Sequence, residues 1–198
     1  KMFGVPSIMV GKGPLGERVE DSNLFLDKVA TELRTGRSHV NRLASNLYGF
    51  SKEDKKDLKT ALDEPSPDGR IEILKTDETK IVHLMSYILG CTLGRYDVRY
   101  AAGERNLPKL RDPLDPLPVC PPGMLTGDND LPLNAAPEGY PLNIPADGIL
   151  VDDPGHDRDV LSRMRAALRL IFDDEAAAER EACELLDESD LRSYFRKT

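Results

Sequence analysis

The chain of 198 residues has no tryptophan and only three cysteines, and its scarcity of cysteine excludes two kinds of architecture. Cys91, Cys120 and Cys183 are odd in number and widely separated, and none of them belongs to a CxxC pair. We therefore expect neither a disulfide framework nor a cysteine zinc site. This use of cysteine favours a cytoplasmic protein.

Long hydrophobic runs are also missing. No apolar stretch approaches the roughly 20 residues of a transmembrane helix, so we expect no membrane partner. The N-terminus lacks the cationic start, the apolar run and the small-residue cleavage site of a signal peptide. Because the first residue is Lys1 rather than Met, we interpret the sequence as a piece of a longer protein.

Positive charge is scarce overall but concentrated at one end. The chain has 35 acidic and 27 basic residues, a net charge of −8. Residues 1–60 carry +3, whereas 61–149 carry −6 and 150–198 carry −5. This balance excludes a generic polybasic nucleic-acid coat, because nonspecific DNA binding depends on Lys and Arg that neutralise phosphates. The net negative charge is still compatible with a local basic face near the N-terminus.

The prolines divide the chain. Eleven of the fifteen lie between Pro108 and Pro154, where a helix cannot continue because proline lacks a backbone donor. We predict a mainly α fold, with a single helical domain over 22–198 and a proline-rich irregular segment at about 101–155. Residues 1–21 are predicted to be an N-terminal extension: a short edge strand with a loop, or the end of a preceding segment.

Apolar spacings of three, four and seven residues predict helices before this segment. The first should begin near Ser22, with Gly36 kinking or dividing it and Tyr48-Gly49 ending it. A second should follow an N-cap at Ser51. The predicted core stripe of the first helix comprises Leu26, Val29, Ala30, Leu33, Val40, Leu43, Ala44 and Leu47.

The strongest helical pattern covers residues 78–93, where apolar residues occupy nearly the whole circumference. Such a helix is a buried one, so we predict that it is the central core helix. Further helices are predicted over 157–172, 174–186 and 188–195, with Val160, Leu161, Met164, Ala167, Leu168 and Ile171 as a core stripe. Their predicted N-caps are Asp173, Asp174 and Ser189.

The proline-rich segment contains enough apolar residues to favour an extended strap packed on the core over a disordered loop. These residues are Leu110, Leu114, Leu117, Val119, Met124, Leu125, Leu131 and Leu133. Short strands are predicted over 71–74 and 144–151, so that the fold has at most a few strands.

Two short motifs suggest chemistry, but their contexts are poor. Residues 11–16 match the G-x-G-x-x-G pattern of phosphate-binding loops, yet we expect no helix to start at the third glycine, so a plain flexible loop is favoured. Glu53 and Lys55 match the E-x-K part of a metal-dependent nuclease site. That pair opens a capped helix, where the helix dipole alone favours an acid.

The remaining reactive side chains favour structural roles. His39, His83 and His156 are too scattered for a metal site, and His83 is predicted to be a hydrogen-bonded core residue. His156 is predicted to be a helix-entry residue. Cys91 has no partner that would lower the pKa of its thiol, so we expect it to be inert. We predict no metal site and no cofactor site in this chain.

A cluster of bases near Gly36 is the strongest candidate for binding. Arg34, Arg37 and Arg42 lie there together with Ser38, His39 and Asn41, and such a patch can contact phosphates. The alternative is a solvated helix face interleaved with acids. Charge alone favours this alternative.

Four segments resemble the C-terminal region of large adenine-specific DNA methyltransferases of the PglX type, from BREX phage defence, and of the related Eco57I-like restriction–modification proteins. Residues 84–96 (LMSYILGCTLGRY) look like a recurring helix of that family. Residues 40–50, 146–151 and 191–196 are similar to its "YGL", "DGIIPI" and "RxYF" stretches. The order and approximate spacing match over about 40–198, and the Gly-Cys-x-x-Gly-Arg-Tyr piece is the most specific.

The resemblance does not include the family's catalytic motifs. The Gly-rich motif that binds S-adenosylmethionine and the Asn-Pro-Pro-Tyr motif that receives a flipped adenine are both missing here. No catalytic residue is therefore carried over. The resemblance implies a module downstream of the methyltransferase core, with S-adenosylmethionine bound by the parent enzyme.

We therefore expect a non-catalytic C-terminal helical module of a type IIG-like enzyme that packs on its methyltransferase and target-recognition domains. DNA contacts are expected from Lys12, Arg34, Arg37, Arg42, Arg95 and Arg99. For Arg95 and Arg99, stabilisation of a helix C-terminus is an equally good role. The alternatives are an interaction adaptor of a phage-defence complex without DNA contact, and the nuclease built on Glu53 and Lys55.

Overall fold

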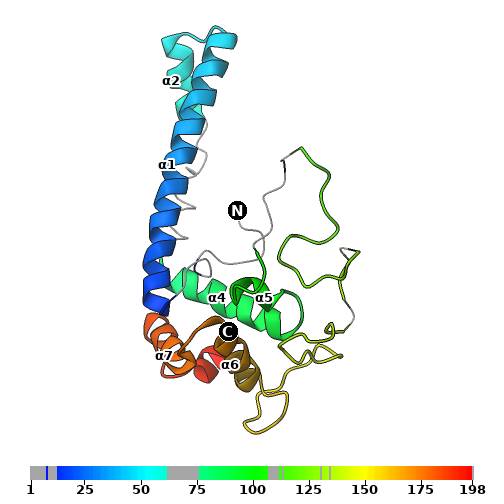
Figure 1. Ribbon diagram of the computed structural model, residues 1–198. Coiled ribbons are helices and arrows are strands. Elements are labelled where there is room, and N and C mark those ends of the chain that lie inside the picture. The colour runs from blue at the N-terminus through cyan, green and yellow to red at the C-terminus, as the bar shows by residue number, and fades with distance from the viewer. Residues whose placement is uncertain are drawn as a thin grey trace.

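A computed structural model describes residues 8, 13–61, 76–106, 112, 114–129, 131–133 and 135–197. The described part of the chain is mainly helical, as the sequence predicts (Figure 1). Its helices are α1 (Leu15–Leu47), α2 (Lys52–Ala61), α4 (Asp77–Thr92), α5 (Val98–Ala101), α6 (Val160–Ile171), α7 (Glu175–Leu185) and α8 (Leu191–Lys197). The strands expected at 5–10 and 71–74 lie outside the described residues, apart from Ile8.

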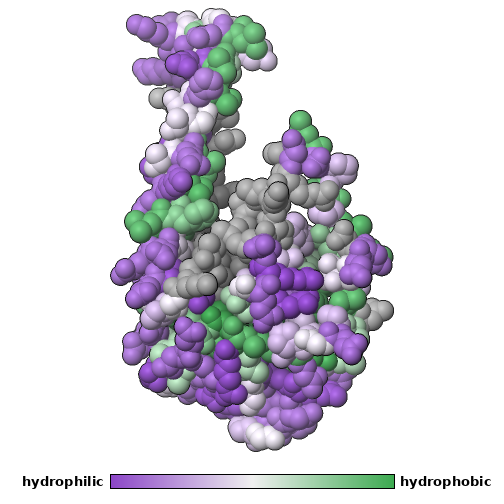
Figure 2. Space-filling view, viewed as in Figure 1, coloured by the Kyte–Doolittle hydropathy of each residue, from purple (hydrophilic) through white to green (hydrophobic). Residues whose placement is uncertain are grey.

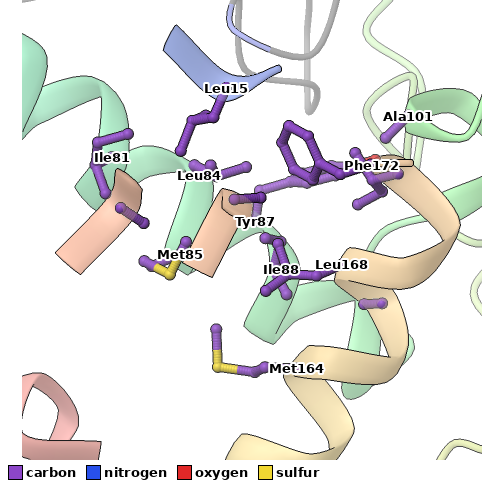
Figure 3. Close-up of a cluster of buried hydrophobic side chains, with 14 of the residues drawn as sticks. Leu15, Ile81, Leu84, Met85, Tyr87, Ile88, Ala101, Met164, Leu168 and Phe172 are labelled. Atoms are coloured by element: carbon purple, nitrogen blue, oxygen red, sulfur yellow. The ribbon is translucent and has the colours of Figure 1, made fainter. Parts of the chain in front are cut away.

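Helix α4 is the central element of the core, as its sequence predicts. Its N-terminus is capped by Thr76, whose side chain accepts a hydrogen bond from the amide of Thr79. Ile81, Leu84 and Ile88 are completely buried, and they pack with residues of α6 and the base of α1 (Figure 3). The circumference is not fully covered, however. His83 is exposed rather than buried, because it lies on the narrow solvent-facing side of α4.

The C-terminal helices complete the core. The predicted stripe of α6 is confirmed, since Leu161, Met164, Ala167, Leu168 and Ile171 are all buried; Val160 is partly buried. Of the N-caps predicted for these C-terminal helices only Asp174 is confirmed, by its hydrogen bond from the amide of Ala177. Asp159 caps α6, and Asp190 accepts a hydrogen bond from the amide of Ser193 at the start of α8. Asp190 thus caps α8 in place of the predicted Ser189, and α7 is capped by Asp174 rather than by Asp173.

Helix α1 begins earlier than predicted and is longer. It starts at Leu15, directly after Pro14, so it crosses the domain boundary that we predicted between residues 21 and 22. It continues through Gly36 without a break. With a rise of 1.5 Å per residue, its 33 residues span about 50 Å, and most of this length projects beyond the core (Figure 1).

The base of α1 is fixed to the core by Arg18, which is only 5% exposed. Its Nη2 donates to the carbonyl oxygen of Ile171 at 2.9 Å, and its Nε donates to the carbonyl oxygen of Gly13 at 3.0 Å. Its guanidinium also lies over the ring of Phe172, 4.4 Å from the centroid. Burial lowers the pKa of this arginine, although Asp173 opposes the shift.

The predicted core stripe of α1 is wrong for most of its length. Leu26 and Ala30 are buried, but Leu33, Val40, Leu43 and Leu47 are between 50% and 80% exposed. The periodicity correctly predicts an amphipathic helix. It does not predict how far along the helix the apolar face is buried, because burial ends where the core ends. We call residues 31–58, the distal part of α1 with the following turn and the start of α2, the arm.

The turn at the tip of the arm forms as its sequence predicts. Gly49 adopts a positive φ of 64° after the last turn of α1, a conformation that glycine adopts without strain. Ser51 and Asp54 then form a reciprocal cap of α2: the amide of Asp54 donates to Ser51 Oγ, and the amide of Ser51 donates to Asp54 Oδ2.

The proline-rich segment has little regular structure. Among its described residues, isolated bridges join Tyr96 with Met124, Thr126 with Pro132 and Val151 with Asp159, so the strand predicted over 144–151 is reduced to one bridge. The strap is anchored by Leu125 and Leu142, which are buried. The prediction of a packed strap is wrong for Leu114, Leu117 and Val119, which are 93%, 95% and 77% exposed.

Candidate functional site

The arm gathers three of the six predicted DNA contacts. Arg34, Arg37 and Arg42 are all exposed on the part of α1 that extends beyond the core. At 100° per residue they lie within an arc of about 140° of the helix surface. Nη2 of Arg42 lies 3.1 Å from Nδ1 of His39. Helix α2 adds Lys52 and Lys55, also exposed, at the same end of the molecule.

The other predicted contacts lie elsewhere. Lys12 is outside the described residues. Arg95 follows α4, and its guanidinium is 5.4 Å from the ring centroid of Tyr96. Arg99 forms a two-point ion pair with Asp97, through Nε to Oδ1 at 2.9 Å and Nη2 to Oδ2 at 2.8 Å. The structure therefore does not bring Arg95 and Arg99 together with the arm, and the geometry of Arg99 favours its structural role.

The Gly-Cys-x-x-Gly-Arg-Tyr segment is an internal packing device. A Cβ on Gly90 would lie 2.5 Å from Cδ2 of Tyr96, so only glycine lets that ring pack against α4. Tyr96 stacks on Tyr87 with the ring centroids 5.2 Å apart. The chain reverses between Tyr87 and Tyr96 at Gly94, whose φ is 73°. Cys91 is completely buried, and burial raises the pKa of its thiol to about 12, which fits the predicted inert residue.

Asp97 directly follows this segment and organises the loops around it. Its side chain is fully buried, pairs with Arg99 and Arg105, and caps α5. Its backbone carbonyl accepts a hydrogen bond from the hydroxyl of Tyr87, and its amide donates to the carbonyl of Gly123. A single acid thus connects the central helix to the proline-rich strap. These contacts give the Gly-Cys-x-x-Gly-Arg-Tyr segment a role in folding and do not indicate a catalytic one.

A pocket of about 290 Å³ lies on the core where three of the four family-like segments meet. Helix α4 contributes Leu89, and its C-cap contributes Leu93. The loop before α6 contributes residues 148 and 150–152, and α8 contributes residues 192, 195 and 196. Val160 is the one lining residue outside these segments and their immediate extension. The fourth segment, residues 40–50, lies at the tip of the arm.

The rim of this pocket carries an ion-pair network. Arg192 pairs with both Asp152 and Asp159, and Nε of Arg196 donates to Oδ2 of Asp152 at 2.6 Å. Asp159 is almost fully buried and also accepts from the amide of Ser162. The hydrogen bond from Arg192 lowers the pKa of Asp159 to about 2, and the bonds from Arg196 and Arg192 also lower that of Asp152. These charges satisfy one another, so the pocket presents a mainly apolar floor.

Neither the G-x-G-x-x-G motif nor the E-x-K motif forms a phosphate-binding or metal site among the described residues. Contrary to our expectation, a helix does start at the end of residues 11–16, but the amide of Gly16 donates to the carboxylate of Glu181 at 2.9 Å. A phosphate would have to displace that acid. Glu53 and Lys55 lie exposed on α2, and no cluster of three metal-ligating side chains occurs in the described part of the chain.

Comparisons with known proteins identify no relative. No protein-family model matches the chain, and neither a curated protein nor a solved structure is significantly similar to it. In addition, none of the helices described here is both long and apolar enough to cross a membrane.

Sequence reasoning missed Asp152, Asp159, Arg192 and Arg196 as a set. The sequence did contain a signal, since three of them lie in or next to the segments that resemble the methyltransferase family. Their mutual contacts could not be inferred, because Asp152 and Arg192 are 40 residues apart.

Proposed function

We propose that this chain is a non-catalytic helical module of a larger, cytoplasmic adenine-specific DNA methyltransferase or restriction–modification protein. In this proposal the arm contacts the DNA backbone, and the core packs on the methyltransferase and target-recognition domains. The observation that carries it is the separation of charge: exposed arginines project on a long helix from a core in which acids outnumber bases. S-adenosylmethionine and the adenine would be bound by other parts of the parent.

Electrostatics supports this role for the arm. Phosphate contacts provide affinity without sequence reading, and they need cations that can approach the duplex closely. A helix that extends well beyond an acidic core meets this need, since it carries the cations away from the core's own negative field. The core pocket supports the second half of the proposal, because family-like segments from distant parts of the chain line one surface recess.

The test is a titration of fluorescent duplex DNA with the protein over a series of salt concentrations. Each phosphate contact contributes about 0.9 to the slope of log K against log salt. We expect the triple variant Arg34→Gln, Arg37→Gln, Arg42→Gln to reduce the slope by about 2 to 3. Arg180→Gln is the control, because this arginine is exposed on α7, far along the chain from the arm. An unchanged slope in the triple variant would contradict the proposal.

A second candidate is an adaptor domain of a phage-defence complex that binds proteins and not DNA. The exposed Leu114, Leu117 and Val119 favour it, since large apolar side chains of this exposure on a proline-rich segment suit a partner's groove. Absence of DNA binding at low salt would favour this adaptor over the DNA-contacting module.

A further inference from the structure

One face of the arm carries an apolar stripe that we define as Leu33, Val40, Leu43 and Leu47. These four side chains are 50%, 62%, 53% and 80% exposed. Figure 2 shows hydrophobic residues gathered along one edge of the projecting helix. A groove of about 610 Å³ runs along the outer half of the stripe, lined by α1 and by Tyr48 at its tip. The spacings of seven, three and four residues are those with which one helix packs against another.

The stripe continues the face that α1 buries against the core. Val19, Leu26, Leu33, Val40 and Leu47 follow one another at intervals of seven residues. Val19 and Leu26 are 5% and 8% exposed, so the change from buried to exposed occurs where the core ends. The sequence thus maintains a packing surface beyond the part of α1 that the core covers.

The position of the core limits which helix can lie on this surface. Because the core occupies the same side of α1 at the base, a parallel copy of the arm would bring its own core into the same space. An antiparallel copy avoids this collision, since its tip reaches the first core and its core lies beyond the first tip.

The stripe is complementary to itself in this antiparallel arrangement. A two-fold axis between Asn41 and Arg42 places Val40 opposite Leu43 of the second copy, and Gly36 opposite Leu47. Nothing lies within 4 Å of a Cβ built on Gly36, which leaves room for the most exposed leucine of the stripe. Arg42 lies on the opposite face of α1, about 160° from Val40, and stays free to contact DNA.

The charges favour the same arrangement. The arm as a whole carries six bases and four acids, whereas acids outnumber bases among the described residues of the core. Antiparallel pairing brings the weakly basic arm of each copy toward the acidic core of the other, which favours association. We propose that two copies of this chain associate through their arms as an antiparallel helix pair, with the stripe as the interface.

Sedimentation velocity over a concentration series from about 1 to 200 µM tests the association. We expect Leu47→Glu and Leu43→Glu to raise the dissociation constant roughly a hundredfold, because the symmetric interface loses each leucine twice. Leu24→Glu is the matched control: it is 69% exposed on the same helix but off the stripe, so its dimerisation should equal that of the unchanged protein. Circular dichroism confirms that each variant stays helical. A monomer at all concentrations, or equal weakening by Leu24→Glu, overturns the proposal.

Disulfide cross-linking tests the direction of the pair. The three native cysteines are buried, so introduced surface cysteines react alone. We expect a mixture of Val40→Cys and Leu43→Cys proteins to form mostly the mixed dimer under oxidation. A parallel pair would instead cross-link each variant with itself, and that result overturns the antiparallel arrangement.

Discussion

The core and the arm are built from the same kind of amphipathic helix, but they differ in what covers the apolar face. In the core, α4 is enclosed by α6, α7 and the base of α1, and its close contacts require particular residues such as Gly90. In the arm, α1 keeps the same seven-residue spacing while its leucines face solvent. The difference shows that apolar periodicity specifies a surface for packing, whereas the chain's topology decides whether the molecule itself supplies the partner.

The largest difference in the free energy of unfolding should appear when one leucine in each region is replaced by alanine. Leu168→Ala removes a side chain that is 1% exposed in the core, and we expect it to lower the free energy of unfolding by about 2–5 kcal/mol. Leu47→Ala, at the exposed end of the arm, should change it by less than about 0.5 kcal/mol. Urea unfolding of dilute protein measures both. Similar losses in the two variants would show that the arm is packed in solution.

A smaller effect, with opposite signs in the two regions, is expected from adding a methyl group to a helical glycine. Gly90→Ala forces the Tyr96 ring away from α4, so we expect a loss of about 1–3 kcal/mol. In dilute, monomeric protein, Gly36→Ala meets open space in the middle of α1 and should stabilise the protein by about 0.5–1 kcal/mol. The two substitutions are chemically identical, so thermal unfolding that shifted in the same direction for both would contradict the contrast.

The smallest effect concerns the acid stability that Asp159 contributes to the core. The folded-state pKa of Asp159 is about 2, below the ordinary value near 3.9, so its contribution is complete above about pH 4 and is lost as the pH falls toward 2. Asp159→Asn keeps a good N-cap but removes the charge that pairs with Arg192. We expect its unfolding midpoint to fall less steeply between pH 4 and 2 than that of the unchanged protein. Equal slopes would exclude this group as a source of the acid sensitivity.

Much of the helical content follows from the sequence. Helices α4, α6 and α7 were predictable because their apolar stripes and their burial coincide. The start of α1 was not, because two glycines and Pro14 indicate a loop, whereas the first turn is held by Glu181 from α7. No local pattern reports such a contact between residues 165 positions apart. For the same reason the exposure of His83 could be seen only once the neighbours of α4 were known.

The candidate site was predictable in part. Arg34, Arg37 and Arg42 form a cluster in the sequence, and a single helix keeps them together. Arg99 shows what the sequence could not predict. Its partner Asp97 is only two residues away, but the ion pair is recognised only from the structure, in which Asp97 is fully buried. The ion pairs of Asp152 and Asp159 with Arg192 depend on the path of the strap and on the docking of α8, which the prolines allow but do not specify.

Because α1 is long, small movements at its attachment by Arg18 cause large movements at its far end. A stiff helix about 50 Å long acts as a lever whose pivot is that buried guanidinium, held by the carbonyls of Ile171 and Gly13. A tilt of about 5° at the pivot moves the far end of such a helix by about 4 Å. The position of Arg34, Arg37 and Arg42 in space therefore depends on a side chain in the core, more than 15 residues before the first of them.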